Sequence, residues 1–300
     1  MTKQVDPELL KVAAQFSAPP VVQTPETVDN VRAAARHARV ELVGRHVDEV
    51  EIVEDGSLRR FLPRSKRDDT AIILFVHGGG WINCDTVTHG AIMTDLAAMT
   101  GHEVIGPDYP LAPKNPYPDG LDMICDLALE IRADHPEARL ILAGDSAGAN
   151  LALAAALRLR DEGHSTAISA LLLWYGCYRK LFNTPSHLAY GGGEFGLRTE
   201  NMEQCWDWYL GGHSTPEYGD LVNAKMVGLP PCYLAEAELD CLADDTRWLA
   251  DKLTAAGVAH SYVLHENVNH GFLHYGEFYA PSYDALQGAV HFLKGLVRSA

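Results

Sequence analysis

Gly144-Asp145-Ser146-Ala147-Gly148 carries the strongest structural signal in this chain, because it joins two different sequence patterns. An apolar run, residues 139–143, precedes it, and a run rich in alanine and leucine, residues 147–160, follows it. This order predicts a buried strand, a tight turn and a helix. Glycines on both sides of the serine let strand and helix approach closely, and such turns hold strained backbone. The pattern therefore predicts a serine hydroxyl raised above one end of a sheet, beside the positive end of a helix.

A second glycine motif, His77-Gly78-Gly79-Gly80-Trp81, follows another apolar run at residues 72–76. A glycine-rich turn at the end of a strand can point backbone N–H groups at a developing oxyanion. We expect these donors to be the N–H groups of Gly79, Gly80 and Ala147, with His77 holding the loop by hydrogen bonds. Two such motifs in this order are much rarer by chance than either one alone.

A serine nucleophile needs a base to accept its proton and a third group to orient that base. In the fold that this motif typifies, the chain order is serine, acid, histidine, and the last two follow late strands. His270 lies in a polar stretch between a predicted strand at 261–264 and the terminal helix, and is the expected base. His265 and His274 are the alternatives.

The expected acid is Asp240, which comes directly after a predicted strand at 232–236. Asp244 and Asp245 stand where a helix is predicted to begin, and carboxylates there commonly cap the helix and favour its dipole. We therefore expect a structural role for those two. The order Ser146, Asp240, His270 matches the order that the fold requires.

Strand and helix patterns alternate along most of the chain, which predicts an α/β protein with a mainly parallel sheet covered on both faces. The first two strand patterns are expected to form an antiparallel edge. Predicted strands lie at 47–53, 59–62, 72–76, 103–105, 139–143, 170–174, 232–236 and 261–264. Predicted helices lie at 86–99, 120–133, 147–160, 245–256 and 283–297.

Two segments fall outside this alternation. Residues 1–44 carry helical patterns only: Pro7 can start a helix over 8–16, and Thr24 with Pro25 can start a second that runs towards Val43. The stretch Ser17-Ala18-Pro19-Pro20 breaks the chain between them. Residues 181–227 contain no evident buried strand but one helical pattern over 199–210, so we interpret them as an insertion between sheet elements.

With these motifs, the chain resembles the hormone-sensitive-lipase-like esterases of the α/β-hydrolase superfamily. Further matches are residues 108–114 (DYPLAPK, similar to DYRLAPE), 238–244 around Asp240, and 269–272 (NHGF). The resemblance spans residues 70–275 and implies an eight-stranded α/β-hydrolase fold. Residues 1–44 would form a helical cap segment and 45–300 the catalytic domain, with 181–227 as the cap insertion. Three positions depart from the family pattern, Pro110, Lys114 and Ala149, and none belongs to the expected triad.

The resemblance implies hydrolysis of short- to medium-chain carboxylic esters through an acyl-enzyme on Ser146, with no metal or organic cofactor. Lactone, arylformamide or other amide hydrolysis by the same triad is the main alternative, and a non-catalytic small-ligand receptor is a remote one. The pocket is expected to include Trp81 and Asp145 beside the glycine motifs. Trp206 and Trp208 would supply an apolar wall, unless they serve only in packing.

Composition limits the partners of this 300-residue chain. A net charge of −16 disfavours nucleic acid and anionic membranes. No run approaches the length of a membrane span, and the N-terminus lacks the apolar core of a signal peptide. Six widely spaced cysteines without a C-x-x-C pair are typical of a reducing compartment. We therefore expect a cytoplasmic protein that acts on a small ester, and family resemblance is compatible with a homodimer.

Overall fold

The computed structural model describes residues 3–17, 23–65, 70–214 and 216–299. Eight strands of these residues form one sheet in the order β1-β2-β4-β3-β5-β6-β7-β8. They are β1 (Val50–Asp55), β2 (Leu58–Pro63), β3 (Ala71–Val76), β4 (Glu103–Pro107), β5 (Arg139–Asp145), β6 (Ala170–Trp174), β7 (Cys232–Leu239) and β8 (His260–Asn269). β2 is antiparallel to both of its neighbours, and every later pair is parallel. The predicted mainly parallel sheet with an antiparallel edge is confirmed.

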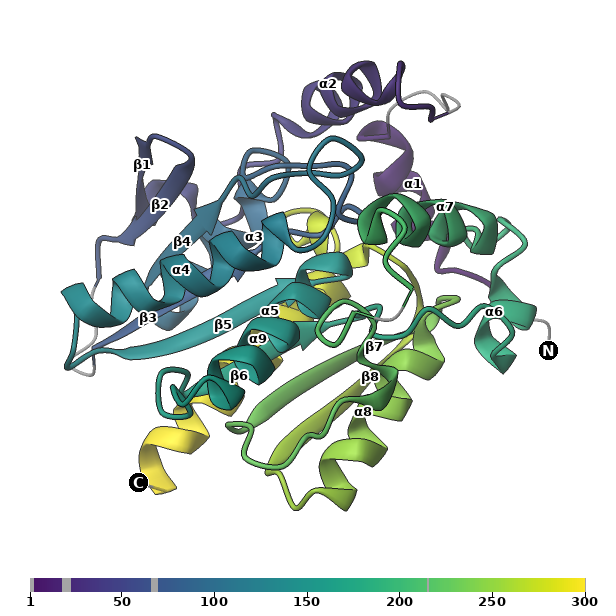
Figure 1. The fold of residues 1–300 in the computed structure, drawn as a ribbon. Coiled ribbons are helices and arrows are strands. Elements are labelled where there is room, and N and C mark those ends of the chain that lie inside the picture. Colours follow the sequence, from purple (N-terminus) through teal and green to yellow (C-terminus); the bar gives the residue numbers. More distant parts are fainter. Residues whose placement is uncertain (1–2, 18–22, 66–69, 215, 300) are drawn as a thin grey trace.

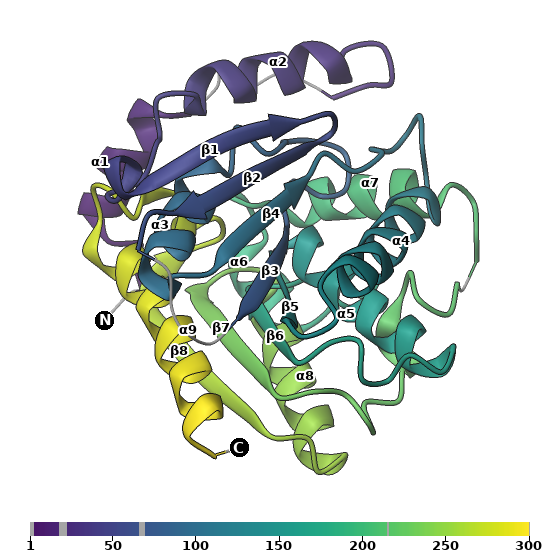
Figure 2. The same ribbon diagram turned by 90° about the vertical axis from the view of Figure 1, so that its left-hand side faces the viewer.

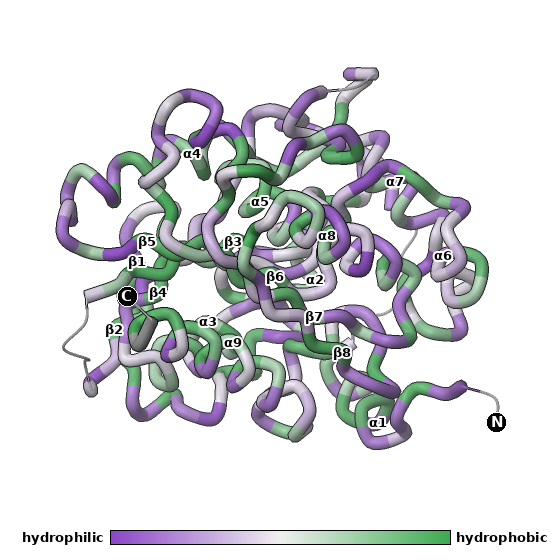
Figure 3. The backbone as a smooth tube through the Cα atoms, turned by 90° about the horizontal axis from the view of Figure 1, so that it is seen from below, coloured by the Kyte–Doolittle hydropathy of each residue, from purple (hydrophilic) through white to green (hydrophobic). Residues whose placement is uncertain are grey.

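Helices cover both faces of the sheet (Figures 1 and 2). On one face lie α3 (Gly90–Thr100) and α9 (Ala280–Ser299), and on the other lie α4 (Asp119–Asp134), α5 (Ala147–Asp161) and α8 (Ala243–Ala255). Alternate residues of the fully buried strand β3 enter the two apolar cores, with Leu74 in one and Phe75 in the other. Burial on both faces explains why the central strands are continuously apolar, as their green colour in Figure 3 shows.

Strand β8 extends further than the sequence predicts. The pattern ended at residue 264, but β8 runs to Asn269, so His270 follows the strand directly. β8 is the last strand of the sheet and pairs only with β7, so most of its side chains are partly or fully exposed. Polar residues can continue an edge strand of this kind, so the apolar pattern in the sequence underestimated the length of β8.

The N-terminal segment contains two helices, α1 (Pro7–Gln15) and α2 (Val28–Arg39). α1 begins at Pro7 as predicted, with the Asp6 side chain accepting from the Glu8 N–H. α2 is shorter than predicted, because the carbonyl of Thr24 closes a turn onto the N–H groups of Thr27 and Val28 and the helix starts only after it. Residues 18–20 of the predicted break lie outside the described residues.

Residues 181–227 contain α6 (Pro185–Tyr190), α7 (Thr199–Leu210) and a 3-10 turn, η2 (Leu221–Asn223), and no strand in their described part. α7 has the predicted bounds, whereas the short α6 was not anticipated. α2 and α7 lie at the same end of the molecule (Figure 1). The Gln204 side chain of α7 donates to the carbonyl of Gln23, 3.1 Å away, which joins the two segments. Every helix among the described residues falls short of the length or apolarity that crossing a bilayer requires.

Candidate active site

Ser146 occupies the tight turn between β5 and α5, with φ 53° and ψ −122°. A positive φ is uncommon for a residue with a side chain, so the turn holds backbone strain. A Cβ on Gly148 would overlap the carbonyl oxygen of Val76, and one on Gly144 would lie 2.5 Å from the backbone carbon of Gly148. Only glycine fits at these two positions. The predicted strand, turn and helix are therefore present, and the helix begins at Ala147.

Three side chains from separate parts of the sequence meet at this turn. The Ser146 hydroxyl lies 2.8 Å from Nε2 of His270, and Nδ1 of that ring lies 2.6 Å from Oδ2 of Asp240. Asp240 follows β7 and is buried, and its other oxygen accepts the N–H of Leu242 at 3.0 Å. With a proton on Nδ1, His270 donates to Asp240 and can accept from Ser146. This is the geometry that a general base needs.

The carboxylate also controls the charge of His270. Burial opposes protonation of the imidazole, but the charge of Asp240 and its hydrogen bond outweigh burial and raise the pKa of His270 above its ordinary value. The Tyr175 ring packs edge-on against the imidazole at 5.0 Å between centroids and covers one side of it. The environment therefore stabilises the imidazolium that forms when the base takes a proton.

This pKa shift predicts the pH dependence of ester hydrolysis. A base must be neutral to accept a proton, so kcat/KM should fall as the pH drops through the pKa of His270 in the free enzyme. Because that pKa is raised, the midpoint of the acid limb should lie above about 6.5, the ordinary histidine value. Initial rates on p-nitrophenyl acetate from pH 5 to 9, corrected for spontaneous hydrolysis, measure it. A midpoint below about 6.5 would contradict the environment described here.

The alternatives to His270 and Asp240 do not reach Ser146. His265 lies within β8, where its ring packs against Phe272 and burial lowers its pKa to about 4. His274 belongs to a short 3-10 turn, η3 (Phe272–Tyr275), and contacts His89. Asp244 accepts the N–H of Ser186, and Asp245 accepts the N–H groups of Tyr178 and Arg179. Asp244 thus holds the insertion against the start of α8, and Asp245 holds the loop that precedes the insertion.

The glycine turn after β3 faces the same site. Gly79 and Gly80 have φ of 111° and 63°, and both line the cavity that contains Ser146. A Cβ on Gly79 would overlap the carbonyl of Asn83, so the turn requires glycine there. Neither N–H group donates to another described residue. Ala147 is the first residue of α5, and its N–H has no acceptor within the helix. These three donors are free to bind an anionic oxygen.

Asp145 has a role that the sequence did not suggest. It was predicted as a pocket residue, and it does line the cavity. Its Oδ1 also accepts the N–H of Gly78 at 2.9 Å and lies 3.2 Å from Nε2 of His89. Asp145 therefore ties the serine turn to the glycine turn, and fixes the distance between nucleophile and oxyanion donors.

The glycine turn is also held from the loop that follows β4. Tyr109 donates to the carbonyl of His77 at 3.0 Å, and their rings stack at 4.3 Å. The His77 side chain bonds to the adjacent carbonyl of Gly78 through Nδ1, at 2.8 Å, and its Nε2 has no hydrogen-bond partner among the described residues. Arg32 of α2 reaches the carbonyls of Ile82 and Ala112, both at 2.8 Å. A cation from α2 thus anchors this loop in a chain where Pro110 and Lys114 replace the charged pair of the family motif.

The cavity above Ser146 has a volume of about 840 Å³, within the range of small-molecule sites. Side chains of both additional segments line it, Val31, Ala35 and Arg39 from α2, and Asn201, Met202, Gln204 and Cys205 from α7. The sequence motifs gave no signal for these residues, because their place depends on how α2 and α7 pack.

None of the three tryptophans is among the residues that line this cavity, and packing was the alternative expected for Trp206 and Trp208. Trp81 and Trp206 are buried in the core, and Trp81 stacks on Tyr209 at 4.3 Å. The side of α7 that carries Trp206 and Tyr209 faces this core, so neighbouring positions such as Cys205 reach the cavity instead. Trp208 is half-buried and lies one turn beyond Gln204, past the residues that line the cavity.

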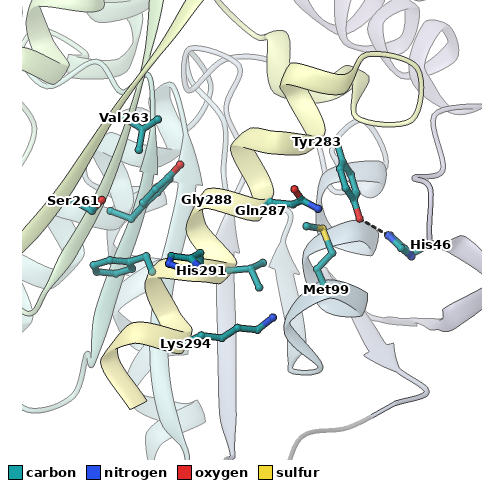
Figure 4. Close-up of a pocket in the computed structure, with 12 residues that line it drawn as sticks. His46, Met99, Ser261, Val263, Tyr283, Gln287, Gly288, His291 and Lys294 are labelled. Carbon is teal, nitrogen blue, oxygen red and sulfur yellow. Dashed lines mark hydrogen bonds between the residues drawn. The ribbon is translucent and has the colours of Figure 1, made fainter. Parts of the chain in front are cut away.

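A second cavity, of about 740 Å³, lies against α9 and is shown in Figure 4. Its residues come mainly from α9 and the neighbouring strands, and the His46 ring bonds to Tyr283 at 2.9 Å. It contains none of the residues that surround Ser146. The chemistry predicted from the motifs therefore belongs to the first cavity.

Comparison with known proteins agrees with this fold. A family model described as an alpha/beta hydrolase fold matches residues 73–274. The acetyl esterase of Salmonella schwarzengrund is 36% identical over 238 residues, which cover 76% of this chain and 73% of that protein. The acetyl esterase of Salmonella paratyphi B is 35% identical over 254 residues, covering 82% of this chain and 78% of that protein.

Solved structures give the same result. An esterase of Pyrobaculum calidifontis has a TM-score of 0.85 and 25% identity, covering 98% of this chain and 99% of that one. An esterase from the bacterial hormone-sensitive lipase family shares the fold with a TM-score of 0.88 and 24% identity, covering 98% and 99% of the two chains. The chain belongs to the hormone-sensitive-lipase-like esterase family of the α/β-hydrolases, and it is a carboxylic ester hydrolase.

Proposed function

We propose that Ser146, His270 and Asp240 are the catalytic triad of this esterase, and that it hydrolyses acetyl and other short-chain esters of small molecules. The observation that carries the proposal is the continuous hydrogen-bond path from the serine hydroxyl through the imidazole to the buried carboxylate. Ser146 and His270 line the same cavity as Gly79 and Gly80, whose N–H groups donate to no other described residue, so nucleophile, base and oxyanion donors face one space.

The reaction follows from this geometry. Ser146 Oγ attacks the ester carbonyl while its proton passes to Nε2 of His270. The carbonyl oxygen becomes an oxyanion held by the N–H groups of Gly79, Gly80 and Ala147, and each such donor lowers the barrier by about 3–4 kcal/mol. The imidazolium then protonates the leaving alcohol, and the acyl group stays on the serine. Water, deprotonated by His270, cleaves this acyl-enzyme and regenerates Ser146.

The side chains beside the glycine turn support a small acyl group. A Cβ on Gly80 would lie 2.6 Å from the sulfur of Cys205, so α7 packs directly against one oxyanion donor. The related Salmonella proteins are acetyl esterases. We expect kcat/KM to be highest for p-nitrophenyl acetate or butyrate and about 10-fold lower for the octanoate. A panel that adds a lactone and an anilide tests this, and faster cleavage of either would replace the ester proposal.

We assign residues 1–44 and 181–227 to a cap over the catalytic domain of residues 45–300. Support comes from α2 and α7, which both line the cavity above Ser146. If the cap sets acyl specificity, Met202→Trp should shift the preference further towards acetate, and an unchanged acyl profile would argue against that role.

The remaining proposals concern location and partners. All six cysteines are free, which supports a reducing, cytoplasmic location, and cell fractionation tests it. The net charge of −16 disfavours nucleic acid as a partner. A homodimer is supported by the outer strand β8, where Tyr262 and Leu264 are 40% and 41% exposed. A single species of monomer mass in sedimentation at micromolar concentration would refute the dimer.

A further inference from the structure

Arg39, the last residue of α2, reaches into the catalytic cavity. It lines the same space as Ser146 and His270. One nitrogen of its guanidinium lies 3.7 Å from the sulfur of Cys84 and 3.4 Å from Nε2 of His274. A positive charge therefore lines the cavity that contains the reacting serine.

Arg39 differs from its neighbours on α2 in having no acid partner. Arg32 pairs with Asp29, and Arg36 pairs with Asp85. Arg39 forms no ion pair with any carboxylate in the described part of the chain, although the sequence contains 40 acidic and only 24 basic residues. Burial opposes the charge of Arg39, but nearby groups that include Asp145 outweigh burial and raise the pKa of the guanidinium, so it stays charged without a direct ion pair.

The groups around Arg39 leave its charge available. His274 is neutral, because burial, helped by the charge of Arg39, holds its pKa well below the usual range. Asp145 is an acid whose charge acts on Arg39, but its Oδ1 accepts the N–H of Gly78 and contacts His89 instead of pairing with the guanidinium. The Tyr275 hydroxyl is a further hydrogen-bond partner of Arg39. Because a guanidinium has five N–H donors, it retains donors for a ligand.

A metal ion is the other ligand that these side chains suggest. Ligand atoms of His89, Asp145 and His274 lie within 4.8 Å of one another, and imidazole with carboxylate is a common metal set. However, a cation held by His274 would meet the guanidinium nitrogen that lies 3.4 Å from its Nε2. This end of the cavity therefore suits an anion better than a cation.

We propose that Arg39 binds a carboxylate of the substrate, so that the preferred substrates are acetyl esters of hydroxy acids. The proposal rests on the proposed function, because a small acetyl group leaves the alcohol part as the only place for the charge. A carboxylate accepts two parallel hydrogen bonds from a guanidinium, which fixes orientation as well as charge. Arg39 is thus a specificity-determining residue rather than a member of the proton-transfer path.

The test compares 4-acetoxybutanoate with 4-acetoxybutanamide, which differ in charge but little in shape, by measuring acetate release at low ionic strength. The net charge of −16 alone would repel the carboxylate and favour the amide. With Arg39 as the binding group, kcat/KM should instead favour the carboxylate by about 10- to 100-fold, the range of charge-assisted hydrogen bonds.

Variants assign the preference to this residue. Arg39→Met should bring the carboxylate-to-amide ratio to about one or below, and Arg39→Lys should restore part of it, since lysine keeps the charge but not the paired donors. Arg36→Met, one turn earlier on α2 and outside the cavity, removes the same charge and should keep the wild-type ratio.

A measurement on the wild-type enzyme removes dependence on folded variants. Butyrate should inhibit p-nitrophenyl acetate hydrolysis competitively, and butyramide should inhibit it about 10-fold less strongly. The role of Arg39 would be overturned if the wild-type ratio of kcat/KM for 4-acetoxybutanoate to that for 4-acetoxybutanamide were at or below one. The same conclusion would follow if that ratio were unchanged in Arg39→Met. Failure of wild-type enzyme to hydrolyse p-nitrophenyl acetate at all would instead overturn the proposed function.

Discussion

Replacing Ser146 with alanine should reduce kcat for p-nitrophenyl acetate by about 10⁵- to 10⁶-fold, the range seen when a serine nucleophile is removed. Among the described residues, the substitution deletes the only hydroxyl that bonds to His270, so no acyl-enzyme can form. The oxyanion donors remain, and a small rate above that of water should persist. Initial rates of purified variant, with circular dichroism to confirm the fold, measure the effect.

Ser261→Ala is the matched control, because this serine lies in the second cavity beside α9. It should retain wild-type kcat within about 2-fold, as expected for a change outside the catalytic residues. A folded Ser146→Ala variant with more than about a tenth of wild-type activity would show that another group attacks the ester.

Asp240→Asn should lower kcat by about 10⁴-fold, as loss of the triad carboxylate does in serine proteases. An amide in place of the carboxylate does not stabilise the imidazolium, and its NH₂ can turn the ring to the wrong tautomer. Asp240 also raises the pKa of His270, so the midpoint of the acid limb should move to lower pH in the variant. Rates from pH 5 to 9 give both quantities at once.

Asp244→Asn serves as the control for Asp240→Asn. Asp244 lies four residues later, in the first turn of α8, and bonds to Ser186 and Arg247 instead of a histidine. It should keep kcat within about 3-fold, since a substitution away from the reacting groups leaves the transition state unchanged. Equal losses in Asp240→Asn and Asp244→Asn, or a midpoint that does not move in Asp240→Asn, would remove Asp240 from the triad.

Short-range patterns explain which features the sequence could predict. Gly144 and Gly148 lie where a side chain would overlap the neighbouring backbone, and Gly79 has a positive φ. Because each of these turns is formed by consecutive residues, a short sequence motif can predict it. Buried parallel strands can also be predicted from sequence, because side chains on both of their faces are buried and therefore apolar. The order of Ser146, Asp240 and His270 then followed from the strands that precede them.

Long-range packing explains what the sequence could not predict. Trp206 and Cys205 are neighbours on α7, and only the position of that helix over the core sends one inwards and the other into the cavity. The bond from Asp145 to Gly78 joins residues 67 positions apart, and no local pattern reports it. The sequence did not predict a role for Arg39 for the same reason, because Arg39 lines the cavity only through the packing of α2 above Ser146.

The most direct test of the catalytic assignment is covalent labelling with an organophosphate such as paraoxon, followed by mass spectrometry of proteolytic peptides. One phosphoryl group per chain should appear on Ser146, with loss of activity in proportion to labelling and no labelling of the Ser146→Ala variant. Labelling of a different residue that tracks the loss of activity, or full activity after Ser146 is labelled, would contradict the site described here.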